Sequence, residues 1–445
     1  MVKDLSHRVG VAVRAWAPEE GDAALYGASA LFALGTIAFS GLVLYRQWAE
    51  LAIGPYAAAT VLSLVLGRWR RHRRKTNPDD AGAHRRAWST PRIVLFLVVL
   101  FGATLIPLSL EVAWRSDGNA AAHVQPEVSV VEQAAKRAAH GLDPYHASVV
   151  KGKVVSVVPG EPAYEAFYPY LPLMTVFGLP SSLHAPVRLT DARIMFSGVT
   201  LLVVLGALAL ARAPSEPKIR TLQVLTVLPT AALLLSTGGD DMPVVAFLLL
   251  AMVLAQRRRP GWSGIVLGIV SAMKFTAWPL AVLALFAARD AAGRRAAGRM
   301  ALGVLLVAGP VVTPFLILNP HVFIVNVILF PLGLSGVASP AASALPGHLL
   351  VDAFPWLHHV LPITACVLGG AVLVRYLIRR TPHSAADVTR LGGWVMLIAI
   401  LVAPATRIGY LVYPINFFVW TAMFRGADRT ELLEGSVALG QPVVT

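Results

Sequence analysis

Charged residues are scarce in this chain: only 14% of its 445 residues are Asp, Glu, Lys or Arg, whereas 56% are hydrophobic. Soluble domains carry roughly 25% charged residues, so this chain has too few of them to cover a water-facing surface. Several apolar runs approach or exceed the ~18–20 residues that span a bilayer. The composition therefore predicts an all-α polytopic membrane protein in the lipid bilayer. It excludes a soluble enzyme, a DNA-binding domain and a secreted disulfide scaffold.

Cofactor and metal motifs are also missing. The only cysteine, Cys366, lies inside an apolar run, which excludes disulfides and cysteine-based metal sites. The twelve histidines show no metal-ligand spacing, and His358 and His359 are adjacent rather than three or four residues apart. The sequence contains no glycine-rich phosphate loop and no HExxH or GxSxG motif. We therefore expect no cofactor and no metal, with a divalent ion at Asp240 and Asp241 as the alternative.

The net charge of +14 would suggest a nucleic-acid partner in a soluble protein. Here the basic residues fall between apolar runs, as cytoplasmic loops do under the positive-inside rule, so we expect no nucleic acid. Nine Lys and Arg residues and only two acids lie between Arg68 and Arg92, which predicts a cytoplasmic loop. Ile93–Trp114 then crosses outward and delivers Arg115–Glu165 to the outer side. Arg outnumbers Lys 31 to 7, which is typical of a GC-rich bacterium and predicts a bacterial cell membrane.

The remaining basic segments give ten crossings with both termini inside. Gly264–Ala288 has basic clusters at both ends, so we interpret it as two half-helices that turn near Lys274. Tyr168–Leu183 is short and proline-rich, and we expect it to be half-inserted on the outer side; a full crossing is the alternative. The expected crossings are Ala24–Tyr45, Leu51–Gly67, Ile93–Trp114, Arg188–Ala211, Thr221–Ser236, Asp241–Gln256, Met300–Leu318, Trp356–Ile378, Gly392–Thr406 and Leu411–Phe424.

This topology predicts three regions. Residues 1–92 hold a cytoplasmic N-terminus, two additional transmembrane helices and the basic loop. Residues 93–424 form the transmembrane core, in which an outer loop at 115–187 carries amphipathic helices. Residues 425–445 form a cytoplasmic tail.

Polar residues inside or beside membrane segments are costly and are functional candidates by default. An outer acid could activate a hydroxyl group, while Lys274 and Arg407 could hold an anionic phosphate at the lipid boundary. The structural alternatives are a solvated helix face for Glu127, a snorkelling side chain for Lys274 and a helix-end anchor for Arg407. For Asp240 and Asp241 the alternative is helix N-capping. The topology places on one outer face Glu127 with Glu132, Asp240 with Asp241, Lys274, Arg407 and the turn Tyr168-Pro169-Tyr170.

Four stretches follow one another in an order that resembles a known superfamily. They are Glu127-Val-Ser-Val-Val-Glu132 followed by Gly141-Leu-Asp-Pro-Tyr145; Phe167-Tyr168-Pro169-Tyr170; Gly238-Gly239-Asp240-Asp241 followed by Gly264-Ile-Val-Leu-Gly268 and Lys274; and Pro404-Ala-Thr-Arg407-Ile-Gly-Tyr410. Together they resemble the GT-C superfamily of polyprenyl-phosphate-sugar-dependent glycosyltransferases, and most closely glycosyltransferase family 87. That family includes actinobacterial mannosyltransferases.

The resemblance implies a GT-C-like helical bundle over about residues 93–424. It implies transfer of a sugar, with mannose favoured, from a polyprenyl-phosphate donor to a lipid or glycan acceptor hydroxyl outside the membrane. The family's usual base is an Asp; Glu127 stands at the matching place, with Asp117 as the alternative. A single favoured acid predicts inversion at the anomeric carbon. The donor phosphate is expected on Lys274 and Arg407, and the sugar or acceptor on Tyr168, Tyr170, Asp240, Asp241 and Tyr410.

Two other functions stay open from the sequence. A transporter or flippase of phosphorylated lipids would use the same cavity, with no chemistry at Glu127. Transporters often contain inverted repeats, and no convincing internal repeat occurs in this chain. An inactive membrane scaffold is the third reading, because Glu127 departs from the family's Asp.

Overall fold

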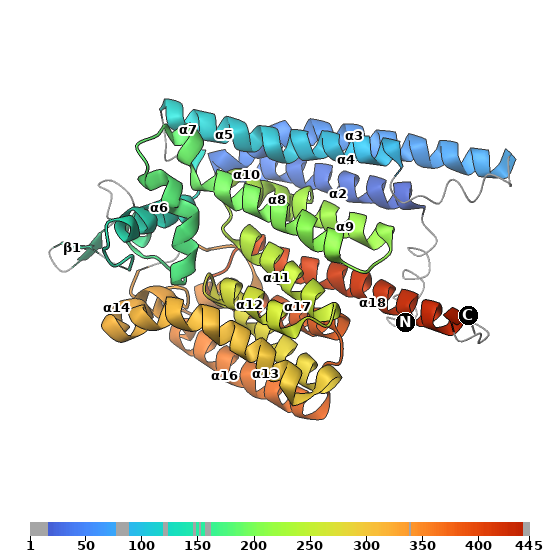
Figure 1. Cartoon of the computed structure of the whole chain (residues 1–445). Helices are drawn as coiled ribbons and strands as arrows, with labels where there is room; N and C mark the ends of the chain where they lie inside the picture. The colour runs from blue at the N-terminus through green and yellow to red at the C-terminus, as the bar shows by residue number, and fades with distance from the viewer. Residues whose placement is uncertain are drawn as a thin grey trace.

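The computed structural model describes residues 17–76, 89–118, 123–145, 148–150, 153–155, 162–337 and 340–438. These residues are almost entirely helical, apart from one short hairpin of two antiparallel strands. Figure 1 shows long helices running side by side, with α6 and the hairpin beyond one end of them, which we call the α6 end. The all-α membrane architecture expected from the composition is confirmed. Most of the predicted N-terminal cytoplasmic segment, residues 77–88 of the basic loop and the end of the tail lie outside the described residues. The strands are β1 (Ser148–Val150) and β2 (Lys153–Val155).

The N-terminal part is a pair of helices, α2 (Pro18–Phe39) and α3 (Val43–Thr76), packed against each other. The sequence predicted one apolar helix ending at Tyr45, but the helix is interrupted at Ser40, Gly41 and Leu42. α3 begins after this break, includes the second predicted crossing and continues into the basic segment. Buried aromatic residues of the pair belong to the main hydrophobic core, so these two helices are integral to the bundle.

The next helix is one continuous rod with a π-helical segment in its middle. Pro107 lies just after this segment and has no N–H to donate to the carbonyl of Ala103, as the residue four positions later in an α-helix would. The indole nitrogen of Trp48 donates to that carbonyl instead, at 2.8 Å. This bond links α3 to the rod at the point where the α-helical bonding pattern changes. The rod consists of α4 (Thr90–Leu100), η3 (Phe101–Leu105) and α5 (Ile106–Asp117).

Three short helices form the α6 end: α6 (Pro126–Ala139), η5 (Ala163–Ala166) and η6 (Pro172–Ser182). Gly178 of η6 lies so close to α6 that a Cβ atom there would overlap the carbonyl group of Val131. η6 has 11 residues in 3-10 geometry, which corresponds to ~22 Å of length. That is shorter than a hydrocarbon core of ~30 Å, so its length argues against Tyr168–Leu183 as a full crossing.

The centre of the bundle is formed by the helices that follow. α9 and α10 meet at a bend of 44°, and Pro229 lies in the first turn of α10, where its missing N–H needs no partner. α11 is buried on most of its faces, as expected for a helix that is apolar all round. These helices are α7 (Val187–Thr190), α8 (Ala192–Leu210), α9 (Ser215–Thr226), α10 (Pro229–Thr237) and α11 (Asp241–Gln256).

The segment interpreted as two half-helices does break near Lys274. It contains α12 (Pro260–Ser271), η7 (Phe275–Ala277) and α13 (Trp278–Leu318). α13 is itself broken at Gly293, where φ is 80° and ψ is 177°, a conformation that favours glycine. Gly264 approaches Met300 and Gly268 approaches Val304, so α12 runs parallel to the second half of α13. Small residues permit this close backbone approach.

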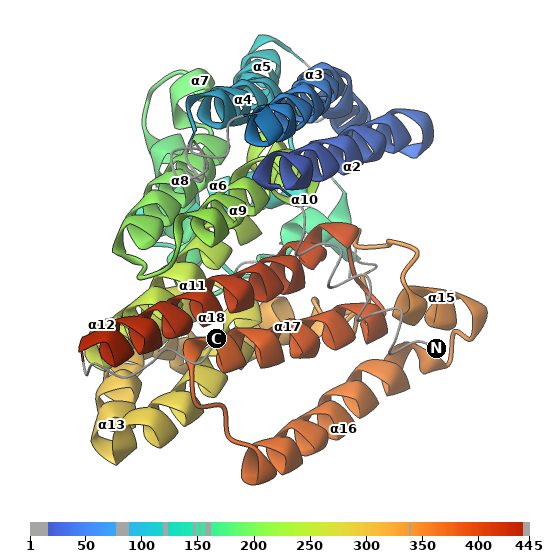
Figure 2. The same cartoon turned by 90° about the vertical axis from the view of Figure 1, so that its right-hand side faces the viewer.

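The C-terminal helices complete the bundle. Figure 2 shows α16 at one edge and the α2–α3 pair at the opposite edge, with α18 between them. α17 and α18 pack against each other. This part consists of α14 (Pro320–Ile324), η8 (Val325–Leu329), α15 (Pro346–Ala353), α16 (Leu357–Arg379), α17 (Ala385–Val402), η9 (Ile408–Leu411) and α18 (Val412–Ala438).

Within the described residues, seven helices are long and apolar enough to cross a membrane, or eight if the bent pair α9 and α10 forms one span. α11 and α12 are apolar but shorter than the usual span. The predicted number of ten crossings, the boundaries of the three predicted regions and the side on which each loop lies stay predictions. A multi-pass membrane protein is what the helices support.

Candidate functional site

Glu127 lies in the first turn of α6 at the α6 end of the bundle. Pro126 is in the same first turn and suits a helix start. The helix start is held by Gln125, which donates from Nε2 to Thr237 Oγ1 at 2.5 Å and to the hydroxyl of Tyr45 at 3.1 Å. The carboxylate of Glu127 is therefore placed near the positive end of a helix dipole, where a negative charge is favoured.

Arg407 lies in the turn between α17 and η9. The neighbouring residue Thr406 pairs with a distant loop: its carbonyl accepts from the backbone N–H of Ser343 at 2.9 Å. The hydroxyl of Ser343 accepts in turn from the backbone N–H of Ile408 at 3.1 Å. The turn that carries Arg407 is thus fixed on both sides of the residue.

Arg407 and Glu127 form a direct ion pair, in which Nη1 of the arginine donates to Oε1 of the carboxylate. Both side chains are mostly buried, with 21% and 15% of their surfaces exposed. Burial, the largest single influence, acts to lower the pKa of Arg407, but the carboxylate of Glu127 and the neighbouring tyrosines together raise it. The second oxygen, Glu127 Oε2, is buried and accepts no hydrogen bond from the described residues. A carboxylate has about four lone-pair sites, so this oxygen retains capacity to accept a hydrogen bond.

The turn between α10 and α11 supplies two further carboxylates. Gly238 ends α10 in the left-handed region, at φ 110°, and a Cβ atom there would overlap Val128 of α6. This close contact places the turn that carries Asp240 and Asp241 next to the first turn of α6. Asp240, at the N-cap position of α11, makes no side-chain cap hydrogen bond within the described part of the chain, whereas Asp241 lies in the first turn, where the helix dipole favours an acid.

Lys274 joins the two carboxylates. Its ammonium donates to Asp240 Oδ1 at 3.0 Å and to Asp241 Oδ1 at 2.5 Å. The three side chains have 11%, 3% and 6% of their surfaces exposed, so this is a buried cluster and Lys274 does not snorkel to an interface. An ammonium has three N–H donors, of which these bonds use two. Asp240 Oδ2 is buried without a hydrogen-bond partner among the described residues.

Tyr170 and Tyr410 bring the two ion-pair groups together. The ammonium of Lys274 lies 5.2 Å from the ring centre of Tyr170 and 5.7 Å from that of Tyr410, within the range of cation–π attraction. Burial raises the pKa of Tyr410 to about 12, and the charges of Lys274 and Arg407 act on it in the opposite direction. The side chains predicted from four separate stretches of sequence thus meet in one cluster.

Three residues considered from the sequence lie outside this cluster. Glu132 binds Arg115 in a two-point ion pair and also accepts from the backbone of α8. Asp117, the alternative base, is exposed and pairs with Arg188 at the surface. Tyr168 is buried behind Tyr170, with their rings 5.4 Å apart. The hydroxyl of Tyr168 has no partner among the described residues.

Sequence reasoning missed several residues that fix the cluster. The hydroxyl of Tyr413 donates to Asp241 Oδ1 at 2.6 Å and lies 2.7 Å from the hydroxyl of Thr276. Tyr413 follows Tyr410 by three residues, on the same side of a helical turn, and this spacing was the available signal. Within the described residues, no group of three or more His, Cys, Asp or Glu side chains is arranged to hold a metal ion.

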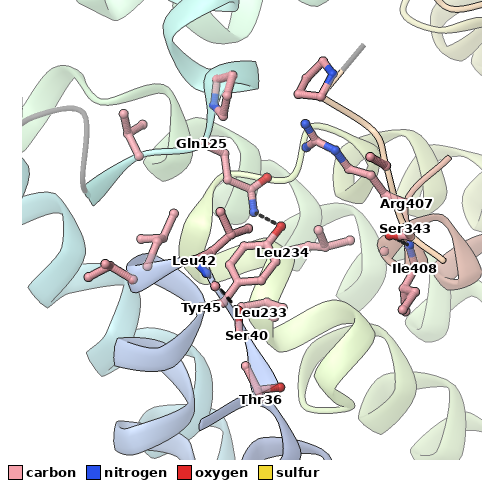
Figure 3. A pocket seen from close by; sticks show the side chains of 18 of the residues that line it. Thr36, Ser40, Leu42, Tyr45, Gln125, Leu233, Leu234, Ser343, Arg407 and Ile408 are labelled. Carbon is pink, nitrogen blue, oxygen red and sulfur yellow. Dashed lines mark hydrogen bonds between the residues drawn. The ribbon is translucent and has the colours of Figure 1, made fainter. Parts of the chain in front are cut away.

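A cavity of about 1260 Å³ opens next to the Glu127–Arg407 pair. Figure 3 shows Gln125, Tyr45 and Leu42 on one side of it and Arg407, Ser343 and Ile408 on the other, with Leu233 and Leu234 of α10 between. The remaining lining comes mainly from the end of α2 and from one face of α6.

A comparison with models of protein families identifies the family of this chain. The model of "Glycosyltransferase family 87" matches residues 168–404, more than half of the chain. The chain belongs to glycosyltransferase family 87. The resemblance seen in the sequence is therefore confirmed, and the protein is a membrane glycosyltransferase. Among curated proteins, none matches this chain.

The match covers only part of the cluster. Tyr170, Asp240, Asp241 and Lys274 lie within the matched residues, whereas Glu127 and Arg407 lie outside them. The α2–α3 pair and α6 also lie outside the match. The individual roles of these side chains in this family 87 member are therefore taken up as proposals.

Proposed function

We propose that this family 87 glycosyltransferase moves a sugar, with mannose favoured, from a polyprenyl-phosphate donor to a hydroxyl of a lipid or glycan acceptor on the outer side of a bacterial plasma membrane, with inversion. The observation that carries this proposal is the buried cluster in which Glu127 keeps one carboxylate oxygen without a hydrogen bond from the described residues. Arg407 binds its other oxygen, and Lys274 lies against the ring of Tyr410 in the same cluster. A base and two phosphate-binding cations are the groups that such a transfer needs.

The proposed step is a single displacement. The acceptor oxygen attacks the anomeric carbon, and its proton passes to Glu127 Oε2 as the new C–O bond forms. The bond between the anomeric carbon and the phosphate oxygen breaks, and the electron pair leaves with the polyprenyl phosphate. One displacement inverts the anomeric configuration. Direct transfer in this scheme requires no second nucleophilic carboxylate.

The leaving phosphate is proposed to bind between Lys274 and Arg407. The third N–H of Lys274 is left over after the bonds to Asp240 and Asp241, and Arg407 has further guanidinium donors beyond the one given to Glu127. Tyr170 and Tyr410 flank this position and offer ring faces and hydroxyl groups to a sugar. The charge that develops on the phosphate in the transition state favours such pre-placed donors.

The experiment is a transfer assay with the purified full chain in proteoliposomes. A radiolabelled polyprenyl-phosphate-mannose, the corresponding arabinose donor and nucleotide sugars are supplied in parallel with a membrane-lipid extract. We expect label to move only from a polyprenyl-phosphate donor, and the product to show the inverted anomeric configuration by NMR. Transfer from a nucleotide sugar alone, or retention of configuration, would contradict the proposal. Movement of intact donor between leaflets without label transfer would favour the flippase function.

A further inference from the structure

The cavity beside the Glu127–Arg407 pair has an apolar end and a polar end. Resting on the proposed function, we propose that it binds the acceptor, and that this acceptor is a lipid with an uncharged, hydroxylated headgroup. The lipid enters sideways past the break between α2 and α3. The N-terminal helix pair, which lies outside the family match, would then contribute a wall of the acceptor site.

The apolar end is open toward the surface that faces the bilayer. Phe39, Leu42 and Val43 line the cavity at the α2–α3 break, and 90%, 56% and 47% of their surfaces are exposed. Leu233 and Leu234 of α10, both buried, form an inner wall. Large apolar side chains exposed on a membrane-spanning pair face lipid, so a lipid chain can pass from the bilayer into the cavity without crossing a polar barrier.

The polar end is formed by one face of α6. Gln125, Ser129 and Gln133 line the cavity and are spaced four residues apart, so they project from the same side of the helix. Ser129 and Gln133 can donate to and accept from sugar or polyol hydroxyls, whereas Gln125, whose amide N–H groups bind Tyr45 and Thr237, can accept through its Oε1. On the inner wall, Thr230 adds a hydroxyl that is buried without a partner among the described residues. Pro126 also lines the cavity, and Glu127 is the next residue in the chain. The proposed base is therefore adjacent to the polar end of the cavity.

The charges of the cavity argue for the acceptor rather than for the donor phosphate. Arg115 lines the cavity but already binds Glu132 at 2.7 Å and Asp191 at 2.7 Å. Arg407 also lines the cavity and is paired with Glu127. Lys136 is exposed at the rim. A phosphate bound at Arg115 would therefore have to compete with the carboxylates of Glu132 and Asp191, whereas an uncharged headgroup would not.

Two glycines in the cavity lining can be replaced by large residues, which would fill the cavity with little strain on the fold. Gly35 and Gly41 line it, and a Cβ atom at either position would meet no atom of the described residues within 4 Å. Gly54 of α3 is exposed and equally unobstructed, but it lies outside the cavity lining. Gly35→Phe and Gly41→Trp are therefore the test variants, and Gly54→Phe is the matched control.

The first readout is steady-state transfer by the full chain in proteoliposomes. We expect Gly35→Phe and Gly41→Trp to raise the KM for the acceptor lipid at least about tenfold, which corresponds to ~1.4 kcal/mol of lost binding, while the KM for the donor stays within about twofold. Gly54→Phe should leave both constants unchanged. A rise in the KM for the donor would show that the cavity holds the donor chain, and unchanged constants in all variants would show that the cavity is not used. Either result overturns the inference while leaving the proposed function intact.

The second readout does not depend on transfer. Monoglucosyl diacylglycerol with a diazirine in one acyl chain is photo-crosslinked to the protein, with diazirine-bearing phosphatidylcholine and polyprenyl phosphate as comparisons. We expect the glycolipid to label residues 32–44 more strongly than either comparison lipid, and Gly35→Phe to abolish the excess. Equal labelling by all three lipids would overturn the inference. If the parent protein shows this pattern but transfers no sugar from any donor, the proposed function fails and the lipid site stands.

Discussion

Arg407 donates a hydrogen bond to Glu127 although the two residues are 280 positions apart in the chain. The pair joins the turn before α18 to the start of α6, and its arginine lines the large cavity. It occupies one oxygen of Glu127 and leaves the other buried, with no hydrogen bond from any residue that the structure describes. In the proposed reaction, this ion pair orients the base and places a cation next to the leaving phosphate at the same time.

Arg407→Ala and Arg407→Lys test how much this cation contributes to binding of the donor phosphate. Loss of the guanidinium removes charged hydrogen bonds worth about 1.5–3 kcal/mol each, so we expect Arg407→Ala to raise the KM for the donor about ten- to a hundredfold. Arg407→Lys keeps the charge but has no planar fork of donors, and it should recover only part of the loss. Titrations of the donor in the transfer assay measure the KM of both variants. A variant Arg407→Ala with the parent's KM for the donor and the parent's kcat would exclude this role.

Lys274→Met should be unstable as well as inactive. The substitution leaves the carboxylates of Asp240 and Asp241 buried without their cation, and removing one partner of a buried ion pair costs about 3–5 kcal/mol. We expect a clearly lower thermal midpoint by intrinsic fluorescence in detergent. Adding Asp240→Asn should restore part of the stability and none of the transfer activity. Unchanged stability in Lys274→Met would mean that the ion pairs do not support the turn.

The glycines of α12 provide a matched pair for the packing of the broken segment. A Cβ atom on Gly264 would overlap the carbonyl of Met300, whereas one on Gly261 would meet nothing within 4 Å. Overpacking costs about 1–3 kcal/mol, so Gly264→Ala should lower the thermal midpoint and Gly261→Ala should not. Equal midpoints for the two variants would contradict the parallel packing of α12 on α13.

The sequence predicted the all-α membrane class and the residues of the cluster because both leave local signals. Composition and apolar run length are set by the bilayer. A charged residue such as Lys274 in the middle of an apolar run is energetically costly, which marks it as a functional candidate. The break near Lys274 was also predicted, from basic residues on both sides of the segment. What these signals share is that each can be recognised within a short window of sequence.

The parts that could not be predicted depend on contacts between distant segments. The bond between Gln125 and Tyr45 spans 80 residues, and that between Tyr413 and Asp241 spans 172; periodicity contains no information about either. For the same reason, the sequence treated the first two helices as an addition, although they line the cavity beside Glu127. Lys274 was expected to be available for a phosphate, and the structure shows that two carboxylates already use part of its capacity.

The central claim is that Glu127 removes the proton from the acceptor hydroxyl. Single-turnover transfer by Glu127→Gln, measured beside Glu127→Asp and the exposed control Asp117→Asn, tests it most directly. General-base catalysis contributes about 10²–10⁴-fold. The account therefore predicts that the folded Glu127→Gln protein loses at least about a hundredfold in rate, and that its thermal midpoint falls because Arg407 loses its carboxylate partner. It predicts partial activity in Glu127→Asp and parent activity in Asp117→Asn. A folded Glu127→Gln variant that transfers sugar at the parent's rate would contradict the account.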